Sequence, residues 1–151
     1  MYKFNFIDDD KLELVYTNKN KEEKRFEFER TINDKKKFEE VNVRAEMKLK
    51  LNLTKQGLTK EDFVIVTKQN GKTVYNEQNY NELKDEYVGT EVFVILDEII
   101  RDKFGMSFDE LWLDMGFTNE NKTELQLFIQ KFSVIINGGK EEEQVKPSKE
   151  N

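Results

Sequence analysis

Hydrophobic and polar positions alternate over much of the first third of the chain. The alternation is most regular in VNVRAEMKLKLNL, residues 41–53, where every odd position is apolar and every even position is polar. A period of two is typical of a strand with one buried face. The pattern predicts an antiparallel strand over 41–53. This segment is longer than the usual strand of about 5–6 residues. We therefore expect it either to curve inside the domain or to project as an arm that pairs with another chain.

Shorter segments around this run predict further strands. Apolar residues recur at every second position in three of them: 2–6, 12–16 and 26–28. The segment DFVIVTKQNGKTVY has two apolar or β-branched runs separated by Asn70-Gly71. Both turn residues tolerate the positive φ of a tight hairpin. We expect an antiparallel, β-rich part over residues 1–75.

After residue 75 the spacing of apolar residues becomes helical. A short polar helix is expected first, and then a broad apolar helix bracketed by Gly89 and Gly105, with Thr90 as its N-cap. The capping box Ser107-Phe108-Asp109-Glu110 opens a helix that stops at Gly116, and the last helix covers about 121–137.

The predicted fold class is α+β. An N-terminal antiparallel sheet with hairpins, residues 1–75, is followed by a three- to four-helix region, residues 76–137, packed on it in one domain. Residues 138–151 contain two glycines, a charge run and the single proline, and they lack hydrophobic periodicity. This composition predicts a disordered charged tail.

The chain contains no cysteine and no histidine. It therefore lacks the usual thiol nucleophile, the commonest metal ligand and the commonest general base near neutral pH. The Asp8-Asp9-Asp10 run lacks the glycine and the spacing of a calcium loop. We therefore expect a non-enzymatic protein with no catalytic residue, no metal ligand and no cofactor.

Charge argues against two further classes of partner. The net charge is −6, and acidic and basic residues are interspersed, which disfavours nucleic acid and acidic lipid. Lys35-Lys36-Lys37 is a basic run without interleaved aromatic residues, and we interpret it as a solvated loop. No segment approaches the roughly 20 apolar residues of a membrane-spanning helix.

The helical half carries more apolar residues than one buried face requires. Such an excess indicates a surface for another subunit or a bound helix. The alternative is that the sheet and the other helices cover these residues from both sides. The candidate partner-binding residues are Phe108, Leu111, Trp112, Met115, Phe117, Leu127, Phe132 and Val134.

The segments SFDELWLDMGF and ELQLFIQKFSVIINGGKEEE, together with the order of a β-rich start, helices and a charged tail, resemble the tail assembly chaperones of long-tailed bacteriophages. The resemblance implies a small, self-associating protein of the host cytoplasm. Such a protein would coat a long helical tape-measure protein until tail tube subunits displace it. A chaperone of this kind would hold an amphipathic helix in an apolar groove.

Two alternatives come from other functional classes. One is a phage-encoded inhibitor of a host enzyme, which predicts a clustered acidic face. The other is a structural component of the virion tail that uses strand 41–53 to pair with a neighbouring subunit.

Overall fold

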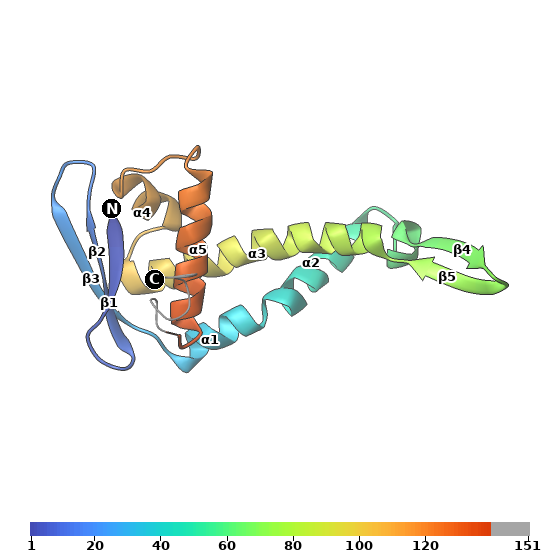
Figure 1. Cartoon of the computed structure of the whole chain (residues 1–151), viewed down its shortest axis with the longest axis horizontal. Helices are drawn as coiled ribbons and strands as arrows, with labels where there is room; N and C mark the ends of the chain where they lie inside the picture. Colours follow the sequence, from blue (N-terminus) through green and yellow to red (C-terminus); the bar gives the residue numbers. More distant parts are fainter. Residues whose placement is uncertain (140–151) are drawn as a thin grey trace. The chain divides into compact units, whose positions relative to one another are not determined.

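The computed structural model of the protein describes residues 1–139, which form helices and antiparallel strands in two compact units (Figure 1). Unit 1 combines Met1–Phe38 with the described residues from Ile95 onward, and unit 2 is Glu39–Val94. The predicted α+β class is confirmed. The compact units do not follow the predicted division at residue 75, because residues from both sides of that position pack together within unit 2.

Unit 1 is built on the antiparallel sheet β1-β2-β3, whose strands are Tyr2–Phe6, Lys11–Thr17 and Glu23–Glu29. The three strands predicted from alternating apolar residues are therefore confirmed. The register pairs Phe4 with Leu14 and Leu14 with Phe26, so their side chains share one face of the sheet. Helices α4, Phe108–Asp114, and α5, Lys122–Ile136, lie on one side of this sheet (Figure 1).

Aromatic side chains fill the space between the sheet and α5. The Phe4 ring centroid is 5.9 Å from that of Phe128 and 5.8 Å from that of Phe132. Both α5 residues are fully buried. The apolar face predicted for the last helix is therefore the face that covers the sheet.

The helix predicted after Gly105 is also confirmed. The Ser107 hydroxyl accepts a hydrogen bond from the Glu110 N–H, and the Glu110 carboxylate accepts one from the Ser107 N–H, at 3.1 and 2.8 Å. This reciprocal pair satisfies two N–H groups that a helix start would leave open. Gly105 itself adopts φ +72°, a backbone conformation that ends α3 and that other residues adopt only with strain.

The prediction of two separate helices before Gly105 was wrong. A single helix, α3, runs through Gln78–Phe104, and it contributes residues 78–94 to unit 2 and 95–104 to unit 1. Gly89 lies inside this helix, and the Thr90 hydroxyl bonds to the Glu86 carbonyl instead of capping a new helix. A single glycine costs a helix only about 1 kcal/mol, which the buried side chains on either side outweigh.

The loop interpretation of Lys35-Lys36-Lys37 was also wrong, because these lysines lie on α1, Ile32–Glu39. The start of α1 is fixed by Thr31 and Asp34, whose backbone N–H groups each bond to the other's side chain, at 2.9 and 3.1 Å. Lys103 pairs with the buried Asp34 carboxylate at 2.9 Å. These contacts stabilise α1. Its three consecutive lysines gave no hydrophobic periodicity from which a helix could be predicted.

Unit 2 contains α2, Val41–Lys55, a 3-10 helix η1, Lys60–Phe63, the hairpin β4-β5 and the first part of α3. The strands β4, Ile65–Gln69, and β5, Lys72–Asn76, confirm the predicted hairpin. Asn70 and Gly71 have φ of 54° and 80°, as the tight turn requires. All residues of both strands are exposed.

The predicted strand over 41–53 was wrong, because this segment is the helix α2 (Figure 1). Apolar residues at every odd position also form two series with a spacing of four, and such a series lies along one side of a helix. Ala45, Leu49 and Leu53 are buried, whereas Val43, Met47 and Leu51 are exposed. Residues 44–51 are all strong helix formers. The virion alternative, in which this segment pairs as a strand, loses its basis.

Within residues 1–139, no helix is both long and apolar enough to cross a bilayer. The predicted disordered tail, 138–151, lies outside the described residues from 140 onward.

Arg30 ties three segments of unit 1 together. Its Nη1 donates to the carbonyls of Ile135 and Gly139, at 2.8 and 3.0 Å, and so satisfies the end of α5. Its Nη2 donates to the Asp9 carbonyl at 2.8 Å, and its Nε bonds to the Asp10 carboxylate at 3.2 Å.

Leu49→Ala and Leu51→Ala distinguish the helix from the predicted strand. Leu49→Ala is expected to lower the free energy of unfolding by about 2–4 kcal/mol, because it leaves a cavity in the core of unit 2. Leu51→Ala should change it by less than about 0.5 kcal/mol. Urea denaturation of the full chain measures both. Equal losses would contradict the helix, because a strand buries both positions on one face.

Arg30→Lys is expected to lower the free energy of unfolding by about 2–3 kcal/mol, because an ammonium cannot reproduce the four directed contacts of the guanidinium, two of them partly buried. Arg101→Lys is the matched control, since Arg101 pairs with Asp97 at an exposed position. Thermal denaturation should show a lower midpoint for Arg30→Lys and an unchanged one for the control. Equal midpoints for the two variants would contradict this role of Arg30.

Candidate functional site

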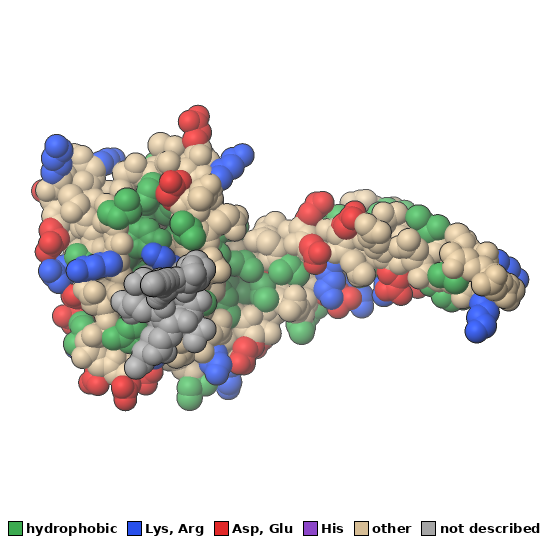
Figure 2. All heavy atoms as spheres, in the orientation of Figure 1, with side chains coloured by type: hydrophobic (Ala, Val, Ile, Leu, Met, Phe, Trp, Pro, Cys, Tyr) green, Lys and Arg blue, Asp and Glu red, His purple; other side chains and the backbone are tan. Residues whose placement is uncertain are grey.

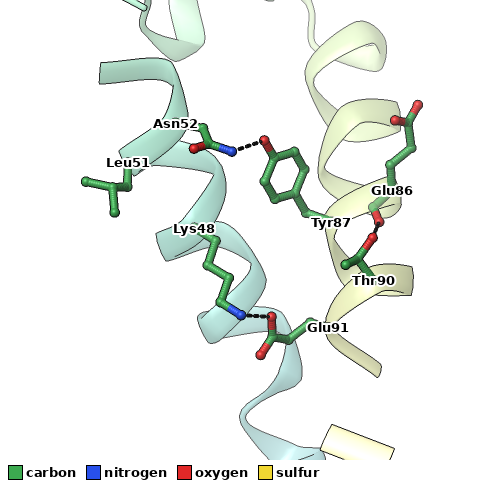
Figure 3. A pocket seen from close by; sticks show the side chains of 7 residues that line it. All are labelled: Lys48, Leu51, Asn52, Glu86, Tyr87, Thr90 and Glu91. Carbon is green, nitrogen blue, oxygen red and sulfur yellow. Dashed lines mark hydrogen bonds and ion pairs between the residues drawn. The ribbon is translucent and has the colours of Figure 1, made fainter. Parts of the chain in front are cut away.

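A cleft of about 400 Å³ opens between α2 and the first part of α3 within unit 2 (Figure 3). We call it the α2/α3 cleft. Its seven lining residues are Lys48, Leu51, Asn52, Glu86, Tyr87, Thr90 and Glu91. Lys48 and Asn52 point from α2 toward α3, whereas Leu51 points away from α3 (Figure 3). The cleft is thus bridged by polar contacts and bordered by one exposed apolar side chain.

Glu91 is the main electrostatic feature of this cleft. Its side chain is 1% exposed, and its Oε1 lies 2.6 Å from the Lys48 Nζ. Its Oε2 lies 2.9 Å from the Arg44 Nε. The second contact is Coulombic, because Oε2 accepts no hydrogen bond from the described residues. Two cations therefore neutralise a buried carboxylate that would otherwise be costly to desolvate.

Further contacts fix α2 against α3 on either side of this ion cluster. The Asn52 amide donates to the Tyr87 hydroxyl at 2.6 Å (Figure 3). Tyr80 is buried beside Leu49 and Leu53. Burial, followed by the negative charge of Glu46, raises the pKa of Tyr80 above its ordinary value. The phenol therefore stays neutral at physiological pH, and its ring packs in the core of unit 2.

The outer side of α2 carries an apolar stripe that its own chain leaves uncovered. We call Val43, Met47 and Leu51 the α2 stripe; they are 61%, 66% and 57% exposed. Their spacing of four places them along one side of the helix, roughly opposite the buried series at 45, 49 and 53. Leu51 also lines the α2/α3 cleft, so the stripe and the cleft are continuous.

Exposed apolar surface is concentrated in unit 2. Eight of the thirteen large hydrophobic side chains that are exposed in the described chain belong to this unit. Figure 2 shows hydrophobic atoms at the surface of unit 2 between acidic and basic side chains. Uncovered apolar surface on this scale indicates an interaction site.

The structure places five of the eight predicted partner-binding residues in the core of unit 1. Leu111 and Phe132 are fully buried, and Phe108, Trp112 and Met115 are at most 6% exposed. Phe132 packs against Phe4 and Phe28 of the sheet, and Trp112 packs against Phe128 of α5. Burial inside the unit is the alternative that the sequence left open. Contact between a partner and these five side chains would require unit 1 to open.

The other three predicted residues lie nearer the surface. Phe117 is half-buried and stacks on Trp112, with ring centroids 4.3 Å apart. Leu127 is 44% exposed on α5. Val134 is half-buried and lines a depression of about 430 Å³ at the end of α5. The eight residues therefore do not converge on one open groove.

Sequence reasoning missed the α2 stripe, although its signal was present. Residues 41–53 contain both series with a spacing of four, and one partner helix can cover only one of them. The length of the run and its helix-forming residues favoured a helix over a strand. The capping pair Thr31 and Asp34 likewise indicated the start of α1.

The chemistry of the cleft suits contact with another polypeptide segment. Its one buried carboxylate is neutralised by Arg44 and Lys48. Within residues 1–139, no group of three acidic side chains is placed to hold a metal ion. An apolar stripe with polar side chains beside it can instead receive the apolar side of another helix.

Comparisons with protein-family models, with curated proteins and with solved structures found no match to this chain.

Glu91→Gln is expected to lower the free energy of unfolding by about 1–3 kcal/mol, because it leaves Arg44 and Lys48 beside a neutral amide. Glu86→Gln is the matched control, since Glu86 points away from α2 (Figure 3). Urea denaturation of both variants provides the measurement. A Glu91→Gln variant as stable as the control would contradict the account of Glu91 as the electrostatic link between α2 and α3.

Proposed function

We propose that the protein is a non-enzymatic binding protein that holds an amphipathic helix of a partner against the α2 stripe. The observation that carries the proposal is the row of three exposed apolar side chains on α2. Recognition of a helix in this way uses apolar contacts spaced three or four residues apart. The proposed role is assembly of a phage tail in the host cytoplasm, as the resemblance to tail assembly chaperones implies.

The size of the stripe suits a complex that can be released. Residues 43–51 rise about 12 Å along the helix at 1.5 Å per residue. Burying three such side chains contributes about 1–2 kcal/mol each, and the cost of association offsets part of this gain. Met47 also supplies a flexible thioether, which adapts to different partner side chains. A chaperone that tube subunits displace needs this modest affinity.

The test compares proteins captured by tagged variants of the full chain from phage-infected and uninfected cells. Met47→Lys and Leu51→Lys each place a charge in the stripe. Val66→Lys is the matched control, because Val66 lies on β4 and is 57% exposed, the same fraction as Leu51. Circular dichroism must first show that all variants keep the wild-type melting profile.

We expect the wild-type protein and Val66→Lys to capture the same helical phage protein after infection. The two stripe variants should retain less than about a tenth of it, since each charge must be desolvated on binding. Equal capture by all four proteins would refute a role for the stripe. Capture of a host enzyme from uninfected cells, with loss of its activity, would replace the proposal with the inhibitor function.

Leu127→Lys separates the stripe from the surface predicted on α5. We expect it to capture the partner as well as the wild-type protein does, because Leu127 lies outside unit 2. Loss of capture by Leu127→Lys alone would move the binding surface to unit 1.

A further inference from the structure

We infer that the partner helix carries acidic residues beside its own apolar stripe. This inference rests on the proposed function and names the chemistry of its partner. It follows from the charges that border the α2 stripe, which are basic on both sides.

Helical geometry places four cations around the stripe. At 100° per residue, Arg44 and Lys48 follow one edge of the row formed by residues 43, 47 and 51, and Lys55 continues the row at its C-terminal end. Lys50 lies on the other edge. The single acidic residue within α2 is Glu46. A helix docked on the stripe would therefore have basic side chains along both of its flanks.

Two of these cations remain available to a partner. Arg44 and Lys48 are held by the buried Glu91. The Lys50 side chain is 65% exposed and lies 3.8 Å from Glu46, a surface pair of little energetic weight. Lys55 is exposed in the last turn of α2. Lys50, beside the row, and Lys55, at its C-terminal end, are thus placed to meet carboxylates of a docked helix.

A second copy of the chain fits this surface less well. Two α2 helices packed stripe to stripe would bring Lys50 and Lys55 of one copy toward those of the other, and like charges across an interface oppose association. The outer side of residues 78–94 in α3 is acidic but largely polar, with exposed residues such as Asn79, Glu82 and Glu86. It offers no matching apolar row.

An anionic membrane surface also fits less well than a helix. The stripe holds three aliphatic side chains, whereas helices that bind membranes present a larger apolar face with aromatic residues. A single helix lying along α2 can follow the narrow apolar row between its basic flanks.

The test uses two synthetic helical peptides that share a row of leucines at every fourth position. One peptide carries glutamates beside this row, and the other carries lysines. Binding to the full chain is measured by fluorescence anisotropy at low and high salt. We expect the glutamate peptide to bind about tenfold more tightly at low salt, from two weak ion pairs, and the preference to shrink as salt screens them.

Charge reversal assigns this preference to particular lysines. The double variant Lys50→Glu, Lys55→Glu is expected to reverse it toward the lysine peptide. The double variant Lys68→Glu, Lys72→Glu is the matched control, because it changes the net charge equally on the exposed hairpin of the same unit. The control should retain the preference for the glutamate peptide.

The other outcomes overturn different parts of the account. Equal binding of both peptides, lost in Leu51→Lys, would refute the acidic partner and leave the proposed function standing. Absence of binding by either peptide, combined with unchanged capture by the stripe variants, would refute the proposed function itself. Dimerisation that Met47→Lys abolishes would identify a second copy as the occupant. Stronger binding to phosphatidylserine vesicles than to either peptide would identify a membrane surface.

Discussion

A helix with an apolar side chain at every second position carries two apolar rows, and a single neighbouring helix can cover only one of them. This constraint governs unit 2. The row that contains Leu49 faces α3 and forms the core, so the row that contains Met47 must face outward. Exposure of three large side chains follows directly from the choice of which row is buried. The candidate binding surface is therefore a consequence of how α2 packs.

Electrostatic contacts determine that choice together with the apolar core. Glu91 is buried on α3, and its position suits only an orientation of α2 that presents Arg44 and Lys48. A rotation of α2 that buried the other row would move these cations away and leave a desolvated carboxylate without compensation, which is costly. Glu91 thus pairs with two of the four cations of α2, whereas Lys50 and Lys55 remain exposed at the surface. The packing of unit 2 thus sets both the apolar and the charged character of the exposed side of α2.

Much of unit 1 could be predicted from local patterns, because its strands, its last helix and the capping box at Ser107 each have a signal within a few residues. Three features depended on more distant contacts. Residues 41–53 fit the strand period and also two helical rows. Their helix-forming side chains favour the helix, and contacts with α3 fix which row is buried. Gly89 continues a helix because buried residues on both sides hold it. Trp112 looked like a groove residue because Phe128, whose ring packs on it at 5.9 Å, belongs to another helix, α5. The α2 stripe could not be assigned until the buried row was known.

Methionine methyl NMR provides the most direct test that the partner binds unit 2 and not unit 1. Met47 is 66% exposed in the α2 stripe, whereas Met115 is 6% exposed in the core of unit 1. Carbon-13-labelled methyl groups of the full chain would be recorded alone and with the glutamate-flanked peptide. The account predicts that the Met47 signal shifts on binding and the Met115 signal does not. A shift of the Met115 signal with an unchanged Met47 signal would contradict it and return the binding site to the helices of unit 1.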